Sequence, residues 1–183
     1  VPRGARAMKW QVGVALLLVA CGTSGPAVEE PGCGERLEGI AGLEAQLFED
    51  DAVAGEVRTA LIRAYADFAN ACNGEPETAE MLFRRADLLR SQGAFEEAMT
   101  QLRDVHDHFP QYPHRARCAF LVGFIAETEL GDREQARLTY RQVLEVHPDS
   151  EEAEWARMSL AQLDLRGEEL LRNFQHHDAT STP

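Results

Sequence analysis

Apolar residues recur every three or four positions along most of the chain, which is the pattern of helices that bury one face. Two such segments, residues 35–49 and 53–71, flank a break near Asp50 and Asp51. Two longer segments follow at residues 79–110 and 117–148, and each reads as a helix, a glycine-centred turn and a second helix ended by a proline. The pattern therefore predicts an all-α fold made of helical hairpins.

The two longer segments are copies of one unit, because their closing prolines lie 38 residues apart and the positions between them agree. The matching pairs are Gly93 with Gly131, Ala98 with Ala136, Leu102 with Tyr140, Val105 with Val143 and Pro110 with Pro148. This resembles the tetratricopeptide repeat, a helix-turn-helix of about 34 residues. The resemblance assigns Ala98 and Ala136 to its small position, Leu102 and Tyr140 to its large apolar position, and Pro110 and Pro148 to its close.

The match departs from the repeat pattern in three places. Leu82 or Phe120 stands where the pattern has a tryptophan. Gly123 and Phe124 sit one position away from the usual pair of a large residue and a glycine, and four extra residues separate the two units. These departures affect the register of the first helix of each unit. They leave the helix-turn-helix architecture as the prediction.

Further helices are predicted on both sides of the repeats. Residues 35–72 form a hairpin without a repeat signature, residues 148–163 form a helix with Pro148 and Ser150 as its start signals, and residues 166–175 form a short last helix. Such end elements act as caps for a stack of repeats. We expect a right-handed α-solenoid of about three to four hairpins over residues 35–175, followed by a disordered tail at 176–183.

The N-terminal residues have the layout of an export signal. Met8 is the expected start, Lys9 supplies a positive charge, and the apolar block from Val12 to Ala20 is too short to span a bilayer as a finished helix. We expect residues 1–20 to be a signal peptide. The glycine- and proline-containing residues 21–34 then form a flexible tether.

The end of this block, Leu18-Val19-Ala20-Cys21, resembles the lipobox of bacterial lipoproteins. The resemblance implies that Cys21 becomes the first residue of the mature protein and carries the lipid, and multiple acyl chains anchor firmly. Gly22 then favours the outer membrane over the inner one. The alternative is an ordinary secretory signal in which the cysteine is incidental.

Three further cysteines remain in this exported chain, where disulfides persist. If residues 35–71 fold back as an antiparallel hairpin, Cys33 and Cys72 lie equally far from its midpoint and meet at its open end. We expect a Cys33–Cys72 disulfide, with two separate buried thiols as the alternative. Cys118, within an apolar segment, is expected to be a small core residue.

Charge and motif content exclude several functions. A net charge of −13 disfavours nucleic acid and anionic lipid surfaces as partners. No arrangement of a nucleophile with a base, no phosphate loop and no zinc-type cysteine spacing is present, so we expect no enzyme activity, no cofactor and no metal. His106, His108 and His114 lie close in sequence, but they flank a helix end, which favours a solvated turn over a metal site.

The segment from Phe120 to Leu163, followed by residues 168–174, is similar to the tetratricopeptide lipoproteins of Gram-negative outer membranes, relatives of BamD and of the Tol-Pal-associated periplasmic repeat proteins. The resemblance implies a non-catalytic scaffold, anchored on the periplasmic face, that binds envelope proteins. In this family the first helix of each hairpin lines a groove. The residues placed there are Glu80, Phe83, Asp87, Arg90, Leu121, Ile125 and Thr128.

Two questions stay open at this point. Packing between repeats is an equally good role for Phe83, Leu121 and Ile125, since all three are apolar. A pilotin-like role, assisting a secretin of a secretion or pilus system, is the alternative to a role in envelope assembly or maintenance.

Overall fold

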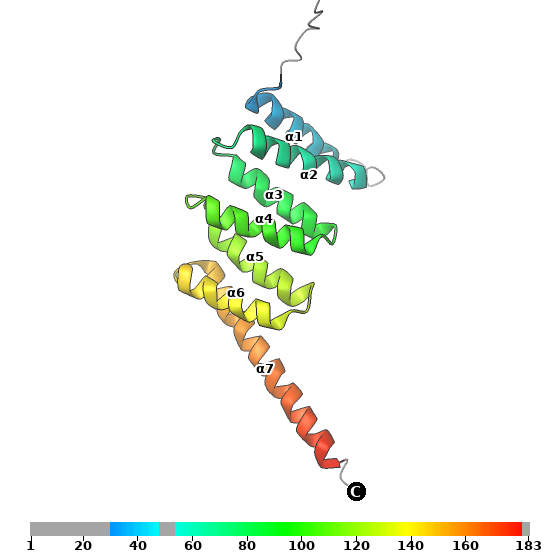
Figure 1. The fold of residues 1–183 in the computed structure, drawn as a ribbon, viewed down its shortest axis with the longest axis vertical. Helices are drawn as coiled ribbons and strands as arrows, with labels where there is room; N and C mark the ends of the chain where they lie inside the picture. Colours follow the sequence, from blue (N-terminus) through cyan, green and yellow to red (C-terminus); the bar gives the residue numbers. More distant parts are fainter. Residues whose placement is uncertain (1–29, 48–53, 181–183) are drawn as a thin grey trace, which may run out of the picture. The chain divides into compact units, whose positions relative to one another are not determined.

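The computed structural model describes residues 30–47 and 54–180, and over these residues it contains seven helices and no strand (Figure 1). The helices are α1 (Cys33–Leu47), α2 (Ala54–Ala71), α3 (Thr78–Ser91), α4 (Phe95–His108), α5 (Arg115–Thr128), α6 (Arg133–Val146) and α7 (Glu151–Thr180). The predicted all-α fold is confirmed. The expected signal peptide, most of the tether and Cys21 lie outside the described residues.

Each helix from α1 to α6 packs against the next one in the chain, as Figure 1 shows, and α7 packs against both α5 and α6. The side chains between them form two clusters. The smaller one joins α1, α2 and α3 around Leu61, Tyr65 and Phe68, while the larger one runs from α3 to α7. Nearest-neighbour packing of this kind is the hallmark of a repeat architecture.

Glycines make the two turns inside the repeats. Gly93 follows α3 with a φ of +79°, and Gly131 follows α5 with a φ of +67°. Residues with a side chain rarely adopt this left-handed conformation, so glycine is the default there. The next helix then starts at once: Asp132 accepts a hydrogen bond from the Gln135 amide at 2.9 Å and so caps α6.

The signature positions of the repeats lie inside the larger cluster. Ala98, Ala136 and Tyr140 are completely buried and Leu102 nearly so. Gly123 of α5 lies directly against the Tyr140 ring of α6, because a Cβ added at Gly123 would stand 2.8 Å from Tyr140 Cε1. The displaced glycine noted in the sequence therefore makes room for the aromatic ring.

The N-terminal hairpin is closed by a disulfide between Cys33 and Cys72, with the two Cα atoms 5.9 Å apart. Cys33 begins α1 and Cys72 directly follows α2, so the bond joins the open end of the hairpin. The buried Thr78 hydroxyl donates to the Cys72 carbonyl at 2.6 Å and fastens the start of α3 to the same point. Cys118, the third cysteine, is a fully buried free thiol.

The C-terminal helix differs from the prediction. Its start is as expected, because the Ser150 hydroxyl accepts a hydrogen bond from the Ala153 amide at 3.1 Å. However, α7 continues through Gly167 to Thr180, where a separate short helix and a disordered tail from residue 176 were predicted. A lone glycine costs a helix only about 1 kcal/mol relative to alanine, which does not break it when no proline follows nearby.

None of the described helices combines the length and the apolar character that crossing a membrane requires.

Candidate partner-binding face

The predicted groove residues of α3 follow one side of that helix, at successive spacings of three and four. Glu80 and Phe83 are partly buried, while Asp87 is exposed and accepts a hydrogen bond from Arg90 at 3.1 Å. The Phe83 ring lies 6.1 Å from the Tyr112 ring and 6.2 Å from the His114 ring, measured between centroids. The structure thus brings Phe83 together with two rings from the loop before α5, while Asp87 and Arg90 pair with each other.

Glu80 is held in place by two donors. The Tyr112 hydroxyl donates to Glu80 Oε2 at 2.6 Å, and Arg84 Nε donates to Oε1 at 2.8 Å. Burial opposes ionisation of this carboxyl, but the hydrogen bonds from Tyr112 and Arg84 outweigh burial and hold the pKa of Glu80 below its ordinary value. The carboxylate therefore stays charged and keeps Tyr112 oriented toward α3.

A cavity of about 440 Å³ lies next to Phe83, between α1, α2 and α3. Its polar lining is a network that the sequence did not predict: Arg84 Nη1 donates to Glu44 Oε1 at 2.7 Å, and the Tyr65 hydroxyl donates to the same oxygen at 2.6 Å. Burial, followed by the hydrogen bond to Glu44, raises the pKa of Tyr65 above its ordinary value. The remaining lining residues are Leu47, Leu61, Phe83, Asp87 and Leu88.

The three predicted groove residues of α5 differ in how exposed they are. Thr128 is exposed and donates from its hydroxyl to the Phe124 carbonyl at 2.8 Å, and Leu121 is half-buried against the larger cluster. Ile125 is completely buried. The assignment of Ile125 to a partner-binding surface is therefore wrong. Helix α5 packs against α4, α6 and α7, and the Ile125 side chain is part of that packing.

Aromatic residues gather where α5 meets α7, a feature that the sequence analysis did not predict. The Phe120 ring lies 5.5 Å from both the Tyr140 and the Trp155 ring centroids. The Arg117 guanidinium stands 5.7 Å from the Trp155 ring centroid and 3.6 Å from Glu152. The sequence signal that could have indicated this cluster was Trp155, near the start of α7. Its ring packs against Phe120 and so covers the end of the second repeat.

The three histidines considered for a metal site have separate surroundings. His114 lies against Phe83 and Tyr112, and His108 Nδ1 contacts the Asp104 carbonyl within its own helix. Within residues 30–47 and 54–180, no group of three or more histidine, cysteine, aspartate or glutamate residues is arranged to hold a metal ion.

Burial raises the pKa of the Cys118 thiol to about 12, which leaves it protonated and unreactive at neutral pH.

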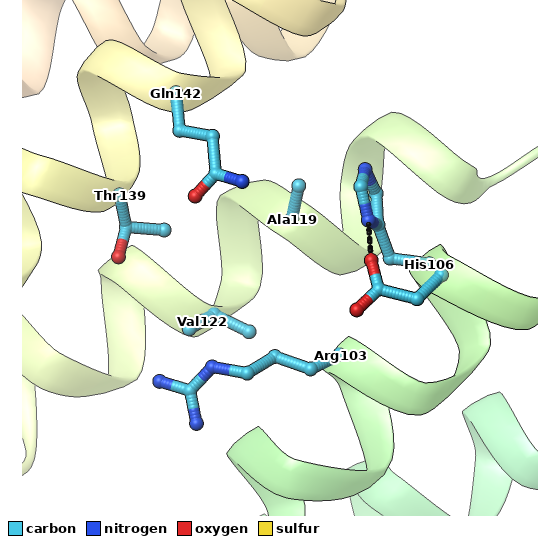
Figure 2. Close-up of a pocket in the computed structure, with 7 residues that line it drawn as sticks. Arg103, His106, Ala119, Val122, Thr139 and Gln142 are labelled. Atoms are coloured by element: carbon cyan, nitrogen blue, oxygen red, sulfur yellow. Dashed lines mark hydrogen bonds and ion pairs between the residues drawn. The ribbon is translucent and has the colours of Figure 1, made fainter.

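His106 instead contacts His147 of the second repeat, with the two Nε2 atoms 3.0 Å apart. Beside it lies a small cavity of about 100 Å³ between α4, α5 and α6, shown in Figure 2. His106 lies at one side of this cavity, and Thr139 and Gln142 of α6 line the other. Asp107, which is hydrogen-bonded to His106, also lines it. The space is too small for a drug-sized ligand, which needs about 300 Å³ or more.

Comparison with known proteins supports the repeat assignment. Residues 80–112 and 118–150 each match the family described as tetratricopeptide repeat. No curated protein matches the chain. The matched segments coincide with α3–α4 and α5–α6, the two hairpins that carry the repeated glycine, alanine and proline positions. Residues 80–150 therefore contain two tetratricopeptide repeats, stacked between an N-terminal hairpin and a C-terminal helix.

Proposed function

We propose that this protein is a non-catalytic scaffold that binds a protein partner through the side of α3 and α5 that carries Glu80, Phe83, Asp87, Arg90, Leu121 and Thr128. We call this surface the α3–α5 face. The observation that carries the proposal is the pair of tetratricopeptide repeats, since these repeats typically serve as protein-interaction domains.

The chemistry of the α3–α5 face supports recognition more than catalysis. It offers a partly exposed aromatic residue, Phe83, beside carboxylates and guanidinium groups that already pair with one another, such as Asp87 with Arg90. Aromatic residues framed by polar groups are common at the centres of protein interfaces. Turnover of cell-wall fragments by the purified protein would contradict a purely binding role.

We propose further that the scaffold is anchored to the periplasmic face of the outer membrane through lipid on Cys21, and acts in envelope assembly or maintenance. The support is the Leu-Val-Ala-Cys sequence at the end of an apolar block of signal-peptide length. An anchor confines the repeats near the membrane and raises the local concentration of any envelope partner, so modest affinity is sufficient.

The anchor is tested by replacing Cys21 with serine and separating membranes from soluble material at high salt. The proposal predicts that the wild-type protein sediments with membranes and that the Cys21→Ser variant moves to the soluble fraction. A variant that stays membrane-bound in high salt refutes the lipid anchor. That result would leave the proposal of a repeat scaffold unaffected, because it rests on the tetratricopeptide repeats and not on Cys21.

The role is tested by chemical cross-linking in native envelopes followed by mass spectrometry of the proteins that co-purify. Enrichment of barrel-assembly or cell-wall maintenance proteins supports the proposal. Enrichment of a secretin instead favours the pilotin-like alternative.

A further inference from the structure

Two imidazole rings connect the ends of the second helices of the two repeats. His106 lies in the last turn of α4, and His147 directly follows α6. Their Nε2 atoms are 3.0 Å apart and their ring planes are nearly perpendicular, at 88°. His106 is only 8% exposed, so this hydrogen bond is largely shielded from water and belongs to the packing between the repeats.

Asp107 determines which nitrogen of His106 carries the proton. Its carboxylate Oδ1 lies 2.6 Å from His106 Nδ1, so Nδ1 must donate, and Nε2 of the neutral ring is left as an acceptor. His147 must then donate from its own Nε2. The geometry therefore requires one proton, and only one, between the two Nε2 atoms.

Acid breaks this arrangement at a defined step. One added proton leaves the hydrogen bond intact, because an imidazolium at His147 still donates to the unprotonated Nε2 of His106. A second proton removes the acceptor, and two cationic rings then face each other at 3.0 Å. Like charges at this distance in partly buried surroundings repel strongly.

The charged groups around the pair come from α4, α5 and α7. Asp107 and Arg103 belong to α4, Arg115 lies at the start of α5, and Glu152 lies in the first turn of α7. Burial, the facing His106 ring and Arg115 lower the pKa of His147, and Glu152 only partly opposes them. Arg115 also donates from Nε to the His106 backbone carbonyl at 2.7 Å, which fixes this cation beside the pair.

We propose that the His106–His147 pair is a pH-sensitive joint between the two repeats, closed near neutral pH and opened by acid. Opening separates the ends of α4 and α6 and admits water to the small cavity beside His106. This inference goes beyond the proposed function, because it concerns how the repeats are held together and not what they bind.

The sign of the effect follows from the direction of the shift. Because the folded state lowers the pKa of His147 below its ordinary value of 6.5, the unfolded state binds the proton more readily. Charging His147 therefore costs stability progressively below about pH 6.5, and the second proton, on His106, then breaks the hydrogen bond.

Two substitutions of His147 separate the effect of its hydrogen bond from the effect of its protonation. The His147→Gln variant carries both an N–H donor and an acceptor oxygen on its side-chain amide, so it can pair with His106 Nε2 whether or not that nitrogen is protonated, and it takes up no proton itself. His147→Leu removes both properties. His108→Asn is the matched control, since His108 lies on the same helix as His106, is exposed and pairs through Nδ1 with the Asp104 carbonyl of its own helix.

The experiment measures amide hydrogen exchange of the full chain at residues 100–108 and 139–147, at pH 7.5 and pH 5, corrected for intrinsic exchange rates. We expect protection at both helix ends to fall about two- to tenfold at pH 5 in the wild type and in His108→Asn, as for the loss of one hydrogen bond. We expect His147→Gln to keep its protection at pH 5, and His147→Leu to have lost it already at pH 7.5.

Two results would overturn the proposal. One is the same loss of protection at pH 5 in His147→Gln as in the wild type. The other, which needs no variant, is an NMR titration in which His147 takes up its proton at or above its ordinary pKa of 6.5. Loss of the α3–α5 face as a binding surface would leave both measurements unchanged, so the two proposals fail separately.

Discussion

Replacing Gly123 with alanine should destabilise the protein, although alanine is the better helix former. The added Cβ would stand 2.8 Å from Tyr140 Cε1, 2.9 Å from Cδ1 and 3.3 Å from Thr139 Cβ. Real Cβ atoms essentially never approach other heavy atoms within 3.0 Å, so the ring or the helix must move.

The Tyr140 ring has little freedom to retreat. It is completely buried, its centroid lies 5.5 Å from that of Phe120, and its hydroxyl donates to Glu127 at 3.0 Å. Overpacking a tight core costs about 1–3 kcal/mol. Removing a glycine from a helix interior returns about 1 kcal/mol. With a rigid ring as the obstacle we expect the upper part of the first range, and thus a net destabilisation of about 1–2 kcal/mol.

The matched control is Gly42→Ala in α1, where an added Cβ meets nothing within 4 Å. This variant should gain up to about 1 kcal/mol from helix propensity alone. Urea unfolding followed by circular dichroism compares the two variants with the wild type. The opposite signs of the two effects separate the contact with Tyr140 from any general effect of removing glycine.

The first repeat suggests a rescue. With the repeats 38 residues apart, Arg85 stands at the position of Gly123 and Leu102 at that of Tyr140. A large side chain is thus tolerated on the first helix where the second helix carries leucine. Gly123→Ala combined with Tyr140→Leu should therefore cost less than the sum of the two single changes. If Gly123→Ala is as stable as the wild type or more so, the reasoning is refuted.

Three shorter predictions concern the N-terminal hairpin and the buried thiol. Replacing Cys33 and Cys72 with serine opens a loop with a sequence separation of 39 residues and should cost about 4 kcal/mol of unfolding free energy in the chain-entropy model. The variant should show a lower urea midpoint that reductant no longer changes. A wild-type midpoint that does not respond to reductant would contradict this prediction. Arg84→Met removes the ion pairs to Glu44 and Glu80, but it should lower the unfolding free energy by only about 0–1 kcal/mol per pair, because the Arg84 side chain is 44% exposed. A loss of several kcal/mol in the same urea assay would contradict this and show that the network is structurally essential. The Cys118 thiol, with its pKa raised to about 12, should resist alkylation at pH 8 until denaturant is added, as peptide mass spectrometry would show, and rapid labelling of the folded protein would contradict its burial.

The parts of the fold that the sequence predicted are those marked by residues with restricted roles. Glycine at Gly93 and Gly131 marks the left-handed turns, and alanine at Ala98 and Ala136 marks the close approach of two helices. These signals are local and repeat at a fixed interval, so one sequence is enough to read them. The Cys33–Cys72 pairing was also accessible, because two helices of similar length bring their outer ends together.

The contacts that the sequence did not predict join distant positions. Glu44 and Arg84 lie 40 residues apart, and His106 and His147 lie 41 apart. Which of many charged or histidine side chains meet depends on the rotation of each helix against its neighbour, and the apolar periodicity fixes that rotation only coarsely. Ile125 shows the same limit: a helix that packs on several sides has no single apolar stripe, so its exposed side could not be assigned.

The most direct test of the central claim asks whether partner binding depends on the α3–α5 face. The double variant Asp87→Arg and Thr128→Arg changes two exposed positions of that face, one on each helix, and Glu97→Arg changes an exposed position on α4 as a matched control. All three proteins are first shown to have equal helix content and urea midpoints. Cross-linked purification from native envelopes, quantified by mass spectrometry, then compares them. The proposal predicts that the wild type and Glu97→Arg recover the same partner and that the double variant loses it; equal recovery by all three would contradict the α3–α5 face as the binding surface.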